Sequence, residues 1–462
     1  MTRQQTKVLT RASGVSTQRV QSKVLRDTPR DIQNLPFPAL RSLGGTVMTL
    51  PLPKLTTIGQ IPQPPPENRP DPGNVSVERP IILILGPTPP PFHGVSIAMR
   101  TLLQSHISVR FRVVTLDTAD RRDITHVENP DWQDVVLFVR QFFKNVYLLA
   151  RYKPALFYLP ICQTRLGFLR DTLFMIPAFL VGSRVVVHLH GGMAFAELFE
   201  QGGALWRRVM TVILRRVARF LVLGEVHRPI FARWVSPHSI SVVPNGIEEL
   251  PVPTAESSSI APHKRKQFRI VYLSTLSQGK GLFILLEAMR LIVHQFPDVE
   301  CAIAGPWWRA TTQIEAEEMV AKLDLAETVS FVGSVTGDKK AAFLRTGDLF
   351  VFPSMYRLEG QPLVILEAMC AGLPVIASDI GSLSETIDDG ITGFIVPQNN
   401  PEAVCDRVLQ LLRDPTLRQS MGKAARARYE QHYTSRAFAD RIEEALLNTL
   451  ERGQSPELNG RA

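Results

Sequence analysis

Two glutamates, Glu359 and Glu367, lie eight positions apart towards the C-terminal end and could bind hydroxyl groups of a ligand. Glu367 is the only ionisable residue on a short apolar helix that begins at Pro362 and stops at Gly372, so we expect that helix to be buried. A buried carboxylate needs donors around it, and the two hydroxyls of a ribose would supply them. Glu359 lies in the loop that feeds the same helix start, where backbone N–H groups favour a phosphate. The alternative is that Glu367 pairs with an arginine or lysine of a neighbouring element.

This stretch resembles the Glu-x7-Glu motif of the retaining family 4 glycosyltransferases, and residues 374–381 and 389–394 resemble further segments of that family. The resemblance implies the α/β GT-B fold, in which two Rossmann-like parallel-sheet domains face a central cleft. It implies a retaining transfer of a sugar from a nucleoside-diphosphate-sugar to an acceptor, in cell-surface polysaccharide or glycolipid synthesis. It assigns Glu367 to the ribose and Glu359 to the sugar. The diphosphate falls to the helix start, namely Gly360, Gln361, Pro362 and Leu363.

Lys280 stands in a glycine loop, residues 277–281, between an apolar strand and a helix. A lysine at a helix N-terminus opposes the macrodipole unless an anion sits there too. In the family a basic residue here contacts the donor diphosphate, often with an arginine five positions earlier. Thr275 occupies that earlier position, so half of the usual clamp is missing. The alternative for Lys280 is a solvated lysine in a flexible loop, and Arg357 is a weak substitute for the absent arginine.

His190 stands at the carboxyl end of an apolar strand and is followed by two glycines. Ligands bind at this edge of open parallel sheets. The family commonly places here a histidine that contacts the donor sugar, so the resemblance makes His190 a catalytic residue together with Glu359. His188 lies deeper on the same strand and is interpreted as a core histidine.

The proline-rich loop of residues 86–96 joins the first strand to a helix. In the family this loop closes over the donor phosphates and borders the acceptor, which assigns Gly94 to donor binding. The alternative is a rigid surface loop.

Strand-like and helical runs alternate along most of the chain, which indicates parallel α/β sheets. Strands are predicted at 81–86, 112–116, 155–159, 184–190, 220–223 and 239–243, and then at 269–273, 299–304, 329–332, 348–352, 374–377 and 393–396. The predicted domains are a disordered tail (1–78), an N-terminal acceptor domain (79–247), a linker (248–267), a C-terminal donor domain (268–450) and a tail (451–462).

Charge and cysteine usage narrow the function classes. The first 78 residues hold ten Lys/Arg and five Asp/Glu, so +5 of the total charge of +9 lies there and the remainder is only mildly basic. This balance disfavours a nucleic-acid partner. The four cysteines are scattered in apolar segments, and no apolar stretch approaches the ~20 residues of a membrane span, which together favour a cytoplasmic protein.

Residues 205–219 read as one amphipathic helix with five arginines, Arg207, Arg208, Arg215, Arg216 and Arg219. Such a helix could lie on an anionic membrane at the inner face, or hold a lipid-linked acceptor. The alternative is an ordinary packed helix with a solvated arginine face, and a saccharide acceptor.

Two other functions stay open on the same fold. One is a non-catalytic nucleotide-binding scaffold, for which Thr275 is the support, and the other is a nucleotide-sugar epimerase. The His188-x-His190 pair could begin a metal-dependent amidohydrolase site, but the further ligands are not evident. No Asp-x-Asp motif stands out either, so we expect a metal-independent enzyme that has no cofactor besides its donor substrate.

Overall fold

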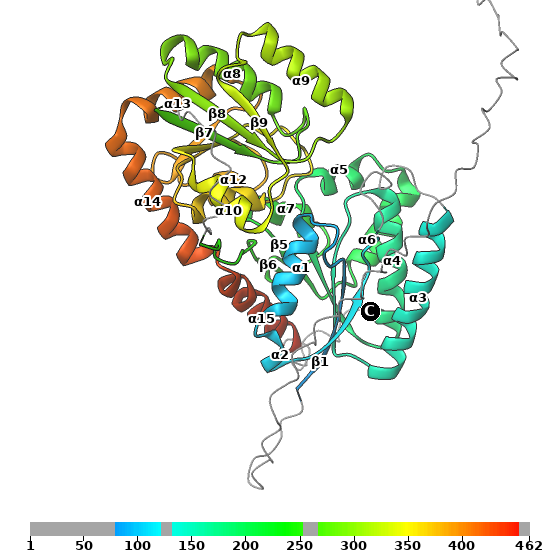
Figure 1. Cartoon of the computed structure of the whole chain (residues 1–462). Coiled ribbons are helices and arrows are strands. Elements are labelled where there is room, and N and C mark those ends of the chain that lie inside the picture. Colours follow the sequence, from blue (N-terminus) through cyan, green and yellow to red (C-terminus); the bar gives the residue numbers. More distant parts are fainter. Residues whose placement is uncertain (1–78, 122–131, 253–266, 452–462) are drawn as a thin grey trace, which may run out of the picture. The chain divides into compact units, whose positions relative to one another are not determined.

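The computed structural model describes residues 79–121, 132–252 and 267–451 (Figure 1). The predicted tail at 1–78, the predicted tail at 451–462 apart from Glu451, and residues 253–266 of the predicted linker lie outside these ranges. The described chain holds two parallel sheets of six strands each.

The first sheet has the strand order β2-β1-β3-β4-β5-β6, and all its pairs are parallel. Each strand is a short apolar run, as expected where helices cover both faces of a parallel sheet. The strands are β1 (Ile81–Gly86), β2 (Arg112–Asp117), β3 (Leu156–Pro160), β4 (Arg184–Leu189), β5 (Arg219–Val222) and β6 (Ile240–Val242).

Alternate side chains of this sheet enter two separate cores. Leu83 and Leu85 of β1 pack on one face with α3 (Trp132–Tyr152), α4 (Arg165–Leu180) and α6 (Ala204–Leu214). Ile82 and Ile84 pack on the other face with α1 (Gly94–Gln104), α2 (Ile107–Arg110) and α15 (Ser435–Glu451). Shorter elements complete this half, namely α5 (Ala194–Glu200), η2 (Glu225–His227), α7 (Arg228–Ala232) and η3 (Pro237–Ser239).

The second sheet has the strand order β12-β11-β10-β7-β8-β9. Its strands are β7 (Phe268–Leu273), β8 (Val299–Ala304), β9 (Val329–Gly333), β10 (Leu349–Phe352), β11 (Val375–Ser378) and β12 (Gly393–Val396). Its helices are α8 (Leu282–Gln295), α9 (Ala310–Lys322), α10 (Gly337–Arg345), α11 (Leu363–Cys370), α12 (Leu383–Thr386), α13 (Pro401–Arg413) and α14 (Pro415–His432). One continuous apolar core joins these elements.

The prediction of two Rossmann-like parallel sheets is confirmed, and each predicted strand lies within two residues of an observed one at either end. The last helix differs from expectation. The predicted donor domain extends to residue 450, but Phe438, Ile442 and Leu446 of α15 are buried in the core of the first sheet. Figure 1 shows α15 beside α1, so the chain returns to the N-terminal half at its end.

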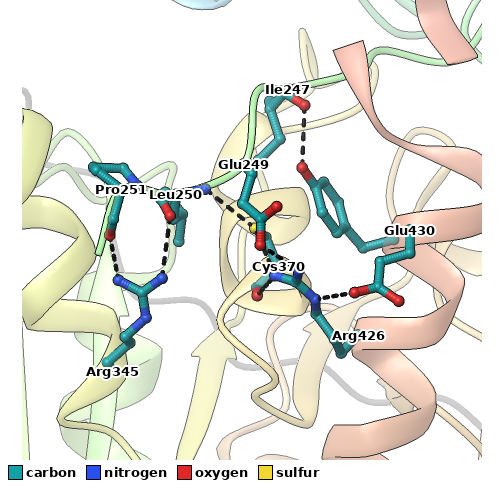
Figure 2. A network of polar contacts seen from close by, with 9 residues as sticks. Ile247, Glu249, Leu250, Pro251, Arg345, Cys370, Arg426 and Glu430 are labelled. Carbon is teal, nitrogen blue, oxygen red and sulfur yellow. Dashed lines mark hydrogen bonds and ion pairs between the residues drawn. The ribbon is translucent and has the colours of Figure 1, made fainter. Parts of the chain in front are cut away.

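The chain leaving the first sheet is fixed against α11 and α14 (Figure 2). The Leu250 N–H donates to Cys370 Sγ at 3.4 Å, and Tyr429 donates its hydroxyl to the Ile247 carbonyl at 3.2 Å. Arg426 donates to the Cys370 carbonyl at 2.6 Å and also pairs with Glu249. The described part of the predicted linker, residues 248–252, is therefore bonded to the second half, and the same contacts hold the C-terminal end of α11.

Candidate functional site

Helix α11 is buried as the sequence predicts, and its carboxylate has a partner. Glu367 is 6% exposed, and its Oε1 is paired with Lys340 Nζ of α10. A lysine of a neighbouring element was the alternative to ribose for this glutamate. Lys340 is only partly buried, so it can turn towards water if a ligand takes its place. The ribose role of Glu367 stays a prediction, with Lys340 as the competing group.

Lys280 and Glu359 are brought together although 79 positions separate them, and they form an ion pair. The Lys280 ammonium also lies 4.4 Å from the centre of the Tyr356 ring. The next residue, Gly281, lets this loop pass close to Pro353. Its φ of +80° favours glycine, and an added Cβ would lie 1.9 Å from the Pro353 carbonyl oxygen. Lys280 therefore neutralises a nearly buried carboxylate at the N-terminus of α8.

The loop that carries Glu359 touches the carboxyl end of β4. Gly191 forms an antiparallel bridge with Glu359, and the Gly192 N–H donates to the Leu358 carbonyl at 3.2 Å. A Cβ at Gly360 would lie 2.7 Å from the His190 carbonyl, so only glycine fits there. The predicted residues His190, Glu359 and Gly360 are thus placed together, where the carboxyl ends of the strands of the two sheets face each other.

The His190 ring is held by packing rather than by hydrogen bonds. Its two ring nitrogens are buried and have no hydrogen-bond partner among the described residues. The ring lies against His188 with the centroids 3.9 Å apart. Burial lowers the pKa of His190 to about 4, because the charged ring would be cut off from water. At neutral pH His190 is therefore an uncharged imidazole with one donor and one acceptor nitrogen, both buried.

His188 occupies the core, in keeping with its interpretation from the sequence. It is fully buried, and its Nδ1 lies 2.8 Å from the Tyr158 hydroxyl.

Gln361 was predicted to bind the donor, but its side chain is engaged within the protein. Its Oε1 accepts from the Asn245 N–H at 2.7 Å, and its Nε2 donates to Thr386 Oγ1 at 2.9 Å. Gln361 is 4% exposed. The Gln361 carbonyl also accepts from Asn245 Nδ2 at 3.1 Å, so both the side chain and the carbonyl hold the 359–362 loop against the end of the first half.

The remaining helix-start residues and Gly94 are placed as follows. Pro362 caps α11 in an extended conformation and Leu363 is its first residue. Gly94 begins α1, and a Cβ there would meet nothing within 4 Å, so no described residue demands glycine at this position. His93 caps this helix through a reciprocal pair of bonds with Ser96.

One arginine prediction is corrected. The predicted helix of residues 205–219 ends at Leu214, and Arg219 instead belongs to β5 and is buried. Arg219 Nε donates to Thr449 Oγ1 of α15 at 2.6 Å. Arg357 pairs with Glu197 of α5, and its role as a substitute for the absent arginine stays a prediction.

Three residues near the site had not been predicted to act there. Lys340 and Tyr356 gave no sequence signal, because packing between elements decides their positions. Asn245 follows β6, and no role in the site was predicted for it; its N–H donates to Gln361 Oε1. Among the described residues no three His, Cys, Asp or Glu side chains gather as a metal site, and metal independence stays a prediction.

Part of the chain is similar in sequence to known glycosyltransferases. Residues 254–428 match the family described as glycosyl transferases group 1. The chain is 30% identical over 192 residues to a phosphatidyl-myo-inositol mannosyltransferase of Mycobacterium leprae, covering 41% of this chain and 49% of that protein. It is 28% identical over 183 residues to the amylovoran biosynthesis glycosyltransferase AmsK of Erwinia amylovora, covering 38% and 44%. The match thus spans about half the length of these curated relatives.

Solved structures extend the likeness in fold to both sheets. Anabaena Alr3699/HepE in complex with UDP has a TM-score of 0.62 at 19% identity and covers 79% of this chain and 99% of its own. Sucrose-phosphate synthase (tll1590) from Thermosynechococcus elongatus has a TM-score of 0.64 at 20% identity and covers 81% and 100%. The chain therefore has the GT-B fold, and its residues 254–428 match the family described as glycosyl transferases group 1.

Proposed function

We propose that this protein is a retaining glycosyltransferase that moves a sugar from a nucleoside-diphosphate-sugar to a saccharide or lipid-linked acceptor, in cell-surface polysaccharide or glycolipid synthesis. The observation that carries the proposal is that Lys280, Glu359 and His190 lie close together at the carboxyl ends of the strands of the two sheets. Two of these residues lie inside the segment that matches glycosyl transferases. The names of the relatives, a mannosyltransferase and a polysaccharide glycosyltransferase, support the same reaction class.

In the proposed donor complex, Lys280 leaves Glu359 and binds the diphosphate at the N-terminus of α8. The diphosphate is a stronger partner for an ammonium than one carboxylate, because it offers more charge and more acceptor oxygens. The carboxylate of Glu359, once released, accepts hydrogen bonds from sugar hydroxyls. Neutral His190 contacts the sugar from the β4 side, and Glu367 exchanges Lys340 for the ribose.

The proposed chemistry depends on charge more than on proton transfer. Negative charge grows on the departing diphosphate, and Lys280 with the start of α11 stabilises it. The leaving phosphate would assist attack on the same face of the sugar, which gives retention. We propose that Lys280 and the helix start supply the positive charge that a metal provides in other enzymes.

A cytoplasmic location with peripheral contact to an anionic membrane is part of the proposal. All four cysteines are free thiols, and three of them are buried. Among the described residues no helix combines the length and apolar character needed to cross a bilayer.

A non-catalytic scaffold is the second candidate. Lys280 and Glu367 are both engaged in ion pairs, and Thr275 supplies no second cation for a diphosphate. If these pairs persist with nucleotide present, the protein would bind donors weakly and turn none over.

A thermal-shift screen of nucleoside diphosphates and their sugars separates the candidates, followed by mass spectrometry of any donor that binds. Release of nucleoside diphosphate supports transfer, and NMR of the product then shows whether the anomeric configuration is retained. A changed sugar still attached to its nucleotide would instead indicate an epimerase. Binding without turnover would favour the scaffold.

A further inference from the structure

The outer faces of α3 and α4 carry apolar stripes that the core does not use. On α4 the exposed residues recur at helical spacing and are between 39% (Ile176) and 80% (Leu180) exposed. On α3 a similar stripe repeats every three or four residues, with an aromatic residue at its start. The stripes consist of Leu166, Leu169, Leu173, Ile176 and Leu180 on α4, and Trp132, Val135, Val136, Val139, Phe143 and Tyr147 on α3.

These two stripes belong to one surface, which we name the α3–α4 face. Both helices cover the same side of the first sheet, because their inner residues share one core. The Phe138 and Phe174 rings pack edge to face with centroids 5.5 Å apart, and Asn145 Nδ2 donates to the Phe174 carbonyl at 3.1 Å. Figure 1 shows the two helices lengthwise beside each other. The outer stripes therefore point away from the sheet together, and exposed apolar areas of this extent mark interaction sites.

The charges on the α3–α4 face are basic. Arg140 and Lys144 follow Val139 and Phe143 by one position, so an exposed basic stripe runs along the apolar one. The carboxylates of these two helices are not exposed: Asp134 is half-buried, and Asp171 is buried beside Arg170. An apolar stripe with flanking cations and aromatic residues is the pattern of helices that lie in a membrane interface.

Helix α6 continues the basic surface next to α4. The Trp206 ring packs against Phe168 of α4 with centroids 5.6 Å apart. Arg207, Arg208, Arg215 and Arg216 are exposed on or just after α6. Four of the five arginines of the predicted membrane contact are therefore exposed, whereas Arg219 is buried in β5.

We propose that the α3–α4 face rests on an anionic lipid surface, with its apolar stripes entering the interface and its arginines and lysines at the headgroups. This inference deepens the proposed membrane contact by assigning it chiefly to α3 and α4. A second copy of the chain is a poorer occupant, because two basic rims would face each other. Residues 1–78 are poorer as well, since they carry an excess of +5.

Vesicle sedimentation of the full chain tests the assignment. Wild type should sediment with vesicles of phosphatidylcholine and phosphatidylglycerol, and much less with phosphatidylcholine alone or at high salt. The double variant Leu169→Gln/Leu173→Gln should lower the partition coefficient by about tenfold or more, because two apolar side chains no longer enter the interface. The control Ile314→Gln/Ile391→Gln, with two exposed isoleucines of the second half, should bind as wild type does.

Each variant is checked for an unchanged melting transition, and donor turnover is measured without vesicles, so a failure of the proposed catalysis is seen separately. Unchanged vesicle binding in Leu169→Gln/Leu173→Gln would overturn the assignment. So would salt-insensitive binding, or the absence of binding in wild type. A wild-type dimer that becomes a monomer in this variant, with no vesicle binding, would show that the face joins two copies instead.

Discussion

Replacing Lys280 by alanine should separate recognition of the diphosphate from recognition of the nucleoside. Lys280 is paired with Glu359, which is 8% exposed. The substitution therefore removes a cation that the diphosphate needs, and it also leaves a carboxylate with little access to water. The first effect lowers the affinity for the diphosphate, and the second mainly lowers the stability of the folded protein.

Their sizes follow from general magnitudes. A hydrogen bond to a charged group contributes about 1.5–3 kcal/mol, so Lys280→Ala should weaken binding of a nucleoside diphosphate by roughly 10- to 150-fold. Wild type must first break the Lys280–Glu359 pair, which places the loss towards the lower end. The unpaired Glu359 should cost about 1–3 kcal/mol of folding stability. The nucleoside has no phosphate, and its affinity should stay within about twofold of wild type.

Calorimetry with UDP, GDP, uridine and guanosine measures the affinities, and thermal unfolding measures the stability. The control is the double variant Lys280→Ala/Glu359→Gln, in which no carboxylate is stranded. It should regain most of the lost stability, and its diphosphate affinity should stay well below that of wild type. An equal loss for nucleoside and diphosphate, or wild-type UDP affinity in the double variant, would refute the assignment of Lys280.

Three further predictions concern other parts of the chain. Glu367→Ala should weaken the binding of UDP and of uridine alike by about 1–3 kcal/mol, because both contain the ribose. Lys340→Met should leave both affinities unchanged. If both substitutions lower only the melting temperature, the Lys340–Glu367 ion pair is purely structural. Deletion of residues 1–78 should leave the melting transition and donor turnover nearly unchanged, because this segment has no sustained apolar period, and a large loss of stability would contradict that. Burial lowers the pKa of His190 to about 4, while an unfolded histidine titrates near ~6.5. Between these two pH values only the unfolded state binds the proton, so the folded state loses stability as the pH falls. The contribution of His190 to the free energy of unfolding, up to about 3 kcal/mol, is therefore present above pH 6.5 and lost as the pH falls towards 4. Urea unfolding at neutral and acidic pH should show a smaller loss in His190→Asn, and equal losses in both proteins would exclude this role.

The strands could be predicted because each depends on a local run of apolar residues. The apolar run Ile81–Gly86 is buried because helices cover both faces of a parallel sheet. Glycines in the loops that follow β7 and β4 mark the turns at the ends of these strands. The convergence of Lys280 with Glu359 was predictable in outline, because carboxyl ends of parallel strands share an edge.

The parts that could not be predicted depend on contacts between distant segments. Helix α15 has an ordinary amphipathic pattern, and nothing in that pattern says which sheet it covers. Arg219 was read as the end of a helix because the sequence shows arginines but not the Thr449 partner that holds its side chain. Lys340 meets Glu367 only through the packing of α10 on α11.

Consumption of a nucleoside-diphosphate-sugar is the most direct test of the central claim. The full chain and its Glu359→Gln variant are incubated with a panel of such donors, and mass spectrometry follows the release of the nucleoside diphosphate. The proposal predicts that wild type releases it from at least one donor, and that the variant still binds this donor but turns it over far more slowly. If wild type binds and consumes no donor of the panel, or if Glu359→Gln turns the donor over at the wild-type rate, glycosyl transfer at this site is contradicted.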